Sequence, residues 1–107
     1  MVRWSAPAKK DLKQIYDYIA RDSQYYAKNV VQNIVARSES LKDFPETGRI
    51  VPETDDSNVR ELFIYSYRLI YEILPDGIVI LAIIHGKRDL SIIDRSESGD
   101  SILIKNF

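Results

Sequence analysis

The chain has 107 residues, of which 45% are hydrophobic and 29% are charged, and its formal net charge is -1. This length fits one globular domain, residues 1–107, with a single core, and leaves no room for two domains. The absence of cysteine excludes disulfides and cysteine-based metal sites, and a single histidine argues against zinc. We therefore expect no metal and no cofactor.

The charge balance and the hydropathy pattern bear on partners. Proteins that grip a phosphate backbone usually carry a basic excess, so a charge of -1 argues mildly against nucleic acid as the main ligand. No apolar run approaches the roughly 20 residues that a membrane helix needs. Residues 1–4 do not lead into the apolar region of a signal peptide. We expect a cytoplasmic protein with no membrane partner.

The first predicted elements are a short strand at residues 2–4 and an amphipathic helix. Ser5 is a favourable N-cap, and Pro7 falls in the first turn, where its missing N–H costs nothing. The helix runs to about Arg21, because apolar residues recur at three- and four-residue spacing. These apolar residues are Ala8, Leu12, Ile15, Tyr16 and Ile19.

A second helix follows after a short link. Asp22 and Ser23 interrupt the first pattern and supply a new cap. The helical period then continues to about Asp43, because Phe44 and Pro45 cannot extend it. The short link predicts two antiparallel helices, a helical hairpin whose apolar faces need a sheet to cover.

The next segment is a loop. Residues 45–53 contain two prolines and one glycine, and polar residues 54–58 follow. This composition predicts an ordered loop and excludes a helix or a central strand.

Three strand-like runs come after the loop. Residues 59–65 form the first, and Ser66 leaves room for a tight reversal into residues 67–74. Residues 75–77, Pro-Asp-Gly, form the next turn, because proline presets φ and glycine accepts positive φ. The last run, residues 78–84, is almost continuously apolar, which predicts a central strand covered on both faces.

The turn also predicts a register. If Leu74 faces Ile78, antiparallel pairing places Arg68 opposite Ile84. His85 then lies diagonally beside this pair, so Arg68 and His85 meet at one end of the sheet. A slip by one residue would put the side chains on opposite faces.

These elements predict an α+β fold: a strand, a helical hairpin and a three-strand antiparallel meander. The helical hairpin packs on one face of a mainly antiparallel sheet. The core spans about residues 2–90, and residues 91–107 form a C-terminal tail that is polar and then apolar. This tail is either an extra packed strand or an exposed edge that awaits a partner.

The ordered set of motifs resembles the RelE/ParE superfamily of type II toxin-antitoxin toxins over roughly residues 2–90. No single piece is specific, but the order is. The residues that carry the resemblance are Trp4-Ser5, Ala8, Leu12, Ile15 and Tyr18-Ile19, then Phe44-Pro45, Gly48-Arg49 and Val51-Pro52-Glu53, then Val59-Arg60-Glu61-Leu62, Tyr67-Arg68-Leu69-Ile70-Tyr71 and Ile84-His85-Gly86-Lys87-Arg88-Asp89.

The resemblance implies a toxin that a small antitoxin protein holds inactive in a hetero-oligomer. RelE-like members are ribosome-dependent enzymes that cut mRNA, whereas ParE-like members poison DNA gyrase and have no established chemistry of their own. The Val-Arg-Glu-Leu and His-Gly-Lys-Arg-Asp motifs and the acidic pI look closer to the ParE side. We expect a gyrase poison. The alternatives are an endoribonuclease acting on the ribosome and mRNA, and a non-toxic relative that acts as a binding module.

Candidate catalytic residues apply to the ribonuclease alternative. Cleavage by the 2′-hydroxyl needs a base, an acid and cations for the developing phosphate charge. Glu53 or His85 could serve as base or acid, with Arg68 and Arg88 as charge stabilisers. The resemblance implies that Arg68 matches an arginine important in RelE-like relatives, and that Glu53 matches a loop carboxylate that acts in some.

The candidate target-binding residues are cationic, and Arg68, Lys87 and Arg88 among them fall at the same end of the predicted sheet. They are Arg60, Arg68, Lys87 and Arg88. Each candidate also has a structural interpretation: a surface ion pair for Arg68, an ion pair with an acidic neighbour for Arg60, a solvated loop for Lys87 and Arg88, a hydrogen-bonded structural histidine for His85, and a plain loop carboxylate for Glu53.

Overall fold

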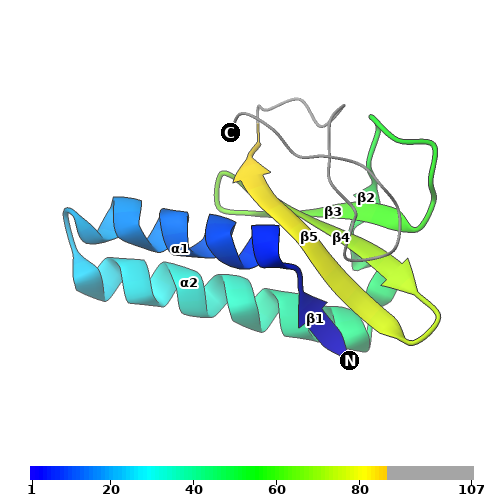
Figure 1. The fold of residues 1–107 in the computed structure, drawn as a ribbon, viewed down its shortest axis with the longest axis horizontal. Helices are drawn as coiled ribbons and strands as arrows, with labels where there is room; N and C mark the ends of the chain where they lie inside the picture. Colours follow the sequence, from blue (N-terminus) through cyan, green and yellow to red (C-terminus); the bar gives the residue numbers. More distant parts are fainter. Residues whose placement is uncertain (87–107) are drawn as a thin grey trace.

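The computed structural model describes residues 1–86, in which two helices and five strands form a helical layer on a mixed sheet (Figure 1). The predicted tail, residues 91–107, and the candidate residues Lys87 and Arg88 lie outside the described residues. The elements in chain order are β1 (Val2–Trp4), α1 (Ala6–Ala20), α2 (Gln24–Glu39), the 3-10 turns η1 (Ser40–Lys42) and η2 (Pro45–Thr47), β2 (Arg49–Ile50), β3 (Val59–Ile64), β4 (Tyr67–Leu74) and β5 (Gly77–His85).

The sheet order is β1-β5-β4-β3-β2, with β1 parallel to β5 and all other neighbours antiparallel. The predicted α+β architecture of strand, helical hairpin and three-strand meander is confirmed. The segment predicted as a loop contains one short strand, β2, which pairs with β3 at the edge of the sheet. Two residues suffice for this edge pairing, and they leave too little pattern for sequence analysis to detect.

Both helices begin at the predicted caps. The Ser5 hydroxyl accepts the Ala8 N–H at 3.1 Å, and the Ser23 hydroxyl accepts the Tyr26 N–H at 3.0 Å. The Ser5 hydroxyl also donates to the Leu81 carbonyl oxygen at 3.1 Å, which ties the start of α1 to β5. The second helix ends as α-helix at Glu39, and the helical turn η1 carries the chain on to Lys42, close to the predicted end.

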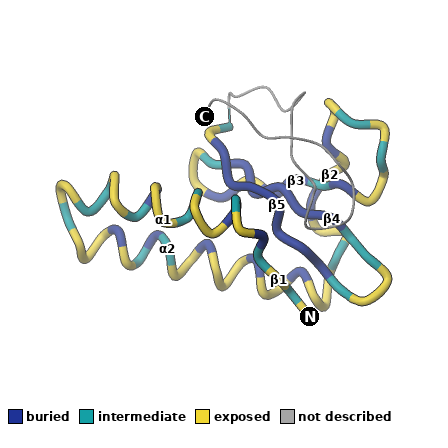
Figure 2. The backbone as a smooth tube through the Cα atoms, viewed as in Figure 1, coloured by how far each residue is buried: buried dark blue, intermediate teal, exposed yellow. Residues whose placement is uncertain are grey.

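The helical hairpin lies along one face of the sheet, and its linked end projects beyond the sheet (Figure 1). That projecting end is largely exposed, whereas β4 and β5 are buried along most of their length (Figure 2). Strand β5 contributes to two apolar clusters: Ile78, Ile80 and Ile83 face the helices, and Val79 and Leu81 lie in the other cluster. The predicted central strand covered on both faces is therefore confirmed.

The β4–β5 hairpin reaches the predicted register by an unpredicted route. The pairing of Leu74 with Ile78 was wrong, because Leu74 faces Gly77 across a tighter turn. A bulge next to the pair Ile70 and Ala82 then adds one residue to β5 and shifts the register by one. The predicted pairs Arg68–Ile84 and Tyr67–His85 are restored beyond the bulge.

The loop after α2 is anchored to the sheet by one buried side chain. The hydroxyl of Tyr71, on β4, donates to the Pro45 carbonyl oxygen at 2.7 Å and accepts the Gly48 N–H at 2.8 Å. These two bonds satisfy backbone groups that would otherwise be buried unpaired. They fix where β2 begins, and so where Arg49 and Glu53 stand.

Candidate functional site

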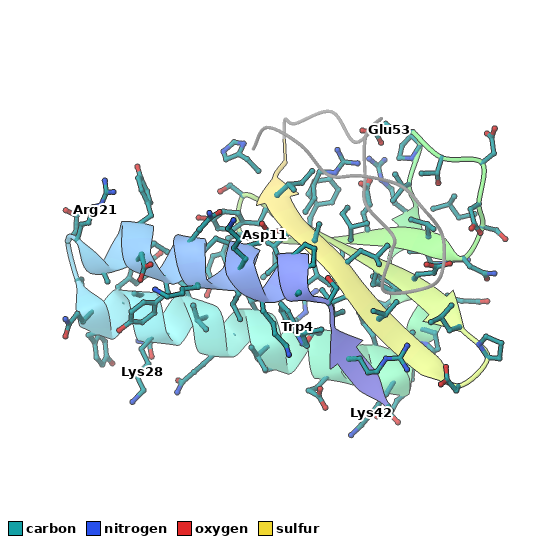
Figure 3. All side chains as sticks on the ribbon, in the orientation of Figure 1. Trp4, Asp11, Arg21, Lys28, Lys42 and Glu53 are labelled. Carbon is teal, nitrogen blue, oxygen red and sulfur yellow. The ribbon has the colours of Figure 1, made fainter. Side chains whose placement is uncertain are left out.

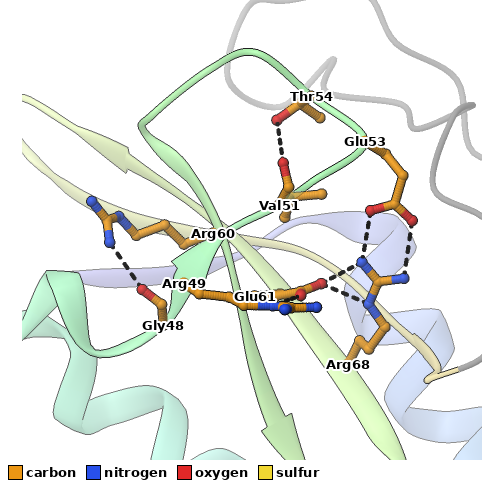
Figure 4. A network of polar contacts seen from close by, with 8 residues as sticks. All are labelled: Gly48, Arg49, Val51, Glu53, Thr54, Arg60, Glu61 and Arg68. Atoms are coloured by element: carbon orange, nitrogen blue, oxygen red, sulfur yellow. Dashed lines mark hydrogen bonds and ion pairs between the residues drawn. The ribbon is translucent and has the colours of Figure 1, made fainter.

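Arg68 is buried in the sheet face that turns away from the helices. Its side chain is 6% exposed, and its guanidinium grips Glu53 with two hydrogen bonds of 3.1 and 3.0 Å (Figure 4). On its other edge Nε donates to Glu61 Oε1 at 2.7 Å. Arg68 was interpreted as a surface residue that pairs with Glu72, but its side chain is buried and forms ion pairs with Glu53 and Glu61.

Glu61 is the centre of this charge cluster, which we define as Arg49, Glu53, Glu61 and Arg68. The Glu61 side chain is fully buried on β3 and accepts hydrogen bonds from both Arg68 and Arg49. Burial lowers the pKa of the Arg68 guanidinium, but the hydrogen bonds to Glu53 and Glu61 outweigh it and leave the pKa raised. Two cations and two carboxylates therefore cancel within the charge cluster.

His85 and Arg68 lie at the same end of the sheet but on opposite faces. Because neighbouring strand positions alternate, Tyr67 and its partner His85 face the helices, whereas Arg68 faces the other side. His85 is exposed and lines a groove beside α1 with Tyr67. The expectation that Arg68 and His85 meet in one site is wrong for their side chains.

Arg60 faces the helical side of β3, away from the charge cluster. Its terminal nitrogen donates to the Gly48 carbonyl oxygen at 2.9 Å, and its Nε is buried without a partner among residues 1–86. The predicted ion pair with an acidic neighbour is replaced by this backbone bond. Its role in target binding stays a prediction.

Asp11, on α1, was missed by sequence analysis. Strand β1 pairs with β5 only as far as Ile80, so the outer edge of β5 beyond that point needs other partners. Asp11, which lies beside this edge (Figure 3), supplies one such partner, because its Oδ2 accepts the Ile83 N–H at 3.0 Å. Burial raises the pKa of Asp11 from 3.8 to about 6, although the bond to Ile83 opposes the shift. The available signal was an acidic residue inside the apolar stripe formed by Ala8 and Leu12.

The raised pKa predicts that Asp11 lowers stability at neutral pH. The folded state binds the Asp11 proton more tightly than the unfolded state does, so protonation of Asp11 favours folding. This contribution to stability is fully present below pH 3.8 and is lost as the pH rises through about 6. Asp11→Asn keeps an acceptor for Ile83 and removes the charge. We expect the variant to be more stable than the wild type by about 1 kcal/mol at neutral pH, after allowance for solvent screening, and equally stable near pH 4.

Urea unfolding at the two pH values measures this difference. Asp17→Asn is the matched control, because Asp17 is exposed on the same helix and its ion pair with Lys13 contributes only a few tenths of a kcal/mol. An Asp11→Asn variant that is less stable than the wild type at neutral pH would contradict the buried-carboxylate account.

Comparison with known proteins agrees with this fold. The family described as the ParE toxin of the type II toxin-antitoxin system, parDE, matches residues 2–90. The chain is 33% identical over 88 residues to Toxin RelE2 of Caulobacter vibrioides, which covers 81% of this chain and 96% of the relative. The chain therefore belongs to the ParE toxin family of type II toxin-antitoxin systems, within the RelE/ParE superfamily.

Two solved structures share the fold. The chromosomal ParDE toxin-antitoxin system from P. aeruginosa matches with a TM-score of 0.66 and 26% identity, over 78% of this chain and 92% of that chain. The toxin-antitoxin complex RelBE2 from Mycobacterium tuberculosis matches with a TM-score of 0.59 and 20% identity, over 79% of this chain and 95% of that chain. Within residues 1–86, no helix is long and apolar enough to cross a membrane, and no group of three or more metal-ligating side chains is present.

Proposed function

We propose that this ParE-family toxin arrests growth by poisoning DNA gyrase, and that a cognate antitoxin neutralises it in a hetero-oligomer. Its family and its similarity to a ParDE toxin-antitoxin system support the antitoxin partner. Gyrase acts in the cytoplasm, which is where we place the protein. Arg60, Lys87 and Arg88 are the proposed target contacts.

The charge cluster is the observation that favours gyrase over RNA cleavage. A ribonuclease needs a base that can take the 2′-hydroxyl proton and a cation that can meet the phosphate. Here Arg68 already holds two carboxylates, and its guanidinium is 6% exposed. The positive charge of Arg68 is neutralised within the protein, and Glu53 is fixed by its hydrogen bonds to Arg68. This arrangement supports a toxin that acts by binding.

An mRNA endoribonuclease is the second candidate. Glu53 and Arg68 are 3.0 Å apart, so a carboxylate and a cation do stand together, and the relative from Caulobacter vibrioides is named Toxin RelE2. This candidate requires Glu53 to leave Arg68 before the two could act on RNA. His85 would have to act from the other face of the sheet.

The antitoxin is proposed to lie across the helical hairpin and to extend the sheet. Strand β1 is an edge strand, and an extended partner segment can pair with such an edge. The projecting end of the helical hairpin adds an exposed aromatic surface that includes Tyr18, Tyr25 and Tyr26. These features would allow a partner that extends the sheet at β1 and also covers the helical hairpin.

A gyrase cleavage assay tests the proposed function. Purified protein is mixed with gyrase, plasmid and ATP, and covalently trapped, cut DNA is scored. We expect cut DNA from the wild type and at least a tenfold reduction, roughly, for the double variant Lys87→Ala/Arg88→Ala. The control Arg3→Ala removes a cation whose exposed ion pair with Asp76 lies near the β4–β5 turn, and should retain activity.

The other outcomes decide between the alternatives. Growth arrest without cut DNA contradicts the gyrase target, and cleaved mRNA ends on ribosomes would then establish the endoribonuclease. No growth arrest when the protein is expressed without its antitoxin would contradict both and leave a non-toxic binding module.

A further inference from the structure

A groove of about 400 Å³ lies between α1 and the adjoining ends of β4 and β5. Asp11, Gln14 and Tyr18 line it from α1, and Tyr67 and His85 line it from the sheet. Asp11 lies on the side of α1 near the end of β5 (Figure 3). The groove is on the opposite face of the sheet from Arg68, so it is separate from the charge cluster.

Asp11 is the one carboxylate among the described residues that line the groove, and one of its two carboxylate oxygens is available to a ligand. Oδ2 accepts the Ile83 N–H, and Asp11 takes part in no ion pair among residues 1–86. Lys10, the adjacent residue on α1, forms no ion pair with Asp11 among these residues and acts on it through its charge, which lowers the Asp11 pKa. Oδ1 therefore remains for an incoming donor.

The charge of Asp11 is not needed for the fold. An asparagine in its place would still accept the Ile83 N–H without the cost of burying an ion. Burial also raises the pKa of Asp11 to about 6, in agreement with a cost for ionising this side chain. A carboxylate kept where an amide would stabilise the fold is typical of a residue that serves a ligand.

Two aromatic residues, Tyr18 and Tyr67, line the groove together with this carboxylate. Tyr18 is 67% exposed at the groove, and burial together with the nearby hydroxyls of Tyr18 and Tyr26 raises the pKa of Tyr67. Tyr18 and Tyr67 come from α1 and β4, so the two groove-lining rings belong to different elements. Aromatic faces beside a carboxylate favour a guanidinium or an ammonium group, which gains both cation–π attraction and a charge-assisted hydrogen bond.

We propose that this groove receives an arginine or lysine side chain of the antitoxin, with Asp11 as its counter-ion and Tyr18 and Tyr67 as its aromatic walls. The inference rests on the proposed antitoxin partner. Tyr25 and Tyr26 are also exposed on the helical hairpin, outside the groove. A free amino acid or a polyamine bound in the groove would leave them uncovered. A polypeptide is the ligand that covers both the groove and these tyrosines.

A titration with small cations tests the groove without the antitoxin. Acetyl-arginine amide is added to the full chain, and the Ile83 amide and Tyr67 ring signals are followed by NMR. Acetyl-citrulline amide is the uncharged control of the same shape. We expect arginine to bind about tenfold more tightly than citrulline, and Asp11→Asn to abolish the difference. Asp17→Asn, exposed on the same helix, should change nothing.

The pH dependence gives a second readout. Binding of the arginine amide should weaken about tenfold from pH 7 to pH 5 as Asp11, whose pKa is raised to about 6, takes up its proton. The other ionisable groups that line the groove or act on Asp11 are Lys10, Tyr18, Tyr67 and His85. Equal binding of arginine and citrulline, or binding by Asp11→Asn equal to the wild type, would overturn the proposal.

The antitoxin arm separates this proposal from the proposed function. The protein encoded beside the toxin gene is purified, and its dissociation constant is measured against the wild type and Asp11→Asn. A rise of about tenfold or more for Asp11→Asn, with Asp17→Asn unchanged, supports the groove. Equal affinity for wild type and Asp11→Asn overturns the groove and leaves the antitoxin partnership intact. No binding to the wild type overturns both, whatever the arginine amide does.

Discussion

Arg68→Met is expected to lower the free energy of unfolding by about 3–5 kcal/mol, because it leaves the fully buried carboxylate of Glu61 without its main partner. A domain of this size has roughly 5–15 kcal/mol in total, so the loss is a large part of its stability. Urea or thermal unfolding at neutral pH measures it. The expected loss follows from a buried carboxylate that keeps only its exposed partner, Arg49, and does not depend on what the protein binds.

Two further variants make this result decisive. Arg49→Met removes the other partner of Glu61, but the Arg49 side chain is 62% exposed, so a cost below about 1 kcal/mol is expected. The double variant Arg68→Met/Glu61→Leu replaces the buried pair with apolar groups and should recover much of the loss. If Arg68→Met costs no more than Arg49→Met, the charge cluster does not stabilise the fold.

This expectation changes how toxicity assays on Arg68 are interpreted. An inactive Arg68→Ala protein could have lost its fold and kept its target-binding surface. Loss of toxicity at Arg68 therefore says nothing about the target unless stability is measured beside it. The Lys87→Ala/Arg88→Ala variant in the gyrase assay needs the same measurement of stability.

Gly48→Ala is expected to lower the free energy of unfolding by about 1–3 kcal/mol. A methyl group there would stand 2.5 Å from the Glu61 carbonyl oxygen and 2.7 Å from the Tyr71 hydroxyl. Neither can retreat, because one is strand backbone and the other is held by the Pro45 carbonyl oxygen at 2.7 Å. The loop that carries Glu53 would have to move away from the sheet.

Gly86→Ala is the matched control for this prediction. Its added methyl group would come no closer than 3.2 Å to the Ser66 carbonyl oxygen, so a smaller effect is expected. Thermal unfolding compares the two, with a shift of roughly 4–8 °C in the midpoint for each kcal/mol. Equal midpoints for Gly48→Ala and the wild type would show that the loop tolerates displacement, and that Tyr71 does not fix it.

The elements of the fold follow from local signals in the sequence. Ser5 and Ser23 cap the helices as predicted, and the Pro-Asp-Gly turn predicts the hairpin. Each signal involves a few adjacent residues whose physical effect is independent of the rest of the chain. The register near the turn was wrong because the apolar run of β5 has no alternation, and without alternation nothing in the pattern marks a bulge.

The sites depend on residues that are distant in sequence, and this limits what the sequence predicts. Glu53, Glu61 and Arg68 come from a loop and two strands, and only the β3 register and the Tyr71 anchor bring them together. Sequence analysis named Glu53 and Arg68 as separate candidates, and it gave Glu61 no role beyond the family motif. Asp11 was missed because its partner is the unpaired edge of β5, which exists only because β1 is three residues long.

The bulge in β5 has a consequence for comparing relatives. Without the extra residue, His85 would stand opposite Ser66 and would project on the same side as Arg68. A homologue with an equally long strand but no bulge would align with this chain without a gap. The residue aligned with His85 would nevertheless lie on the face of the sheet that carries Arg68. After Leu81, therefore, residue roles can be transferred between family members only after their strands have been superposed. One inserted residue moves a side chain from the face with the Asp11 groove to the face with the charge cluster.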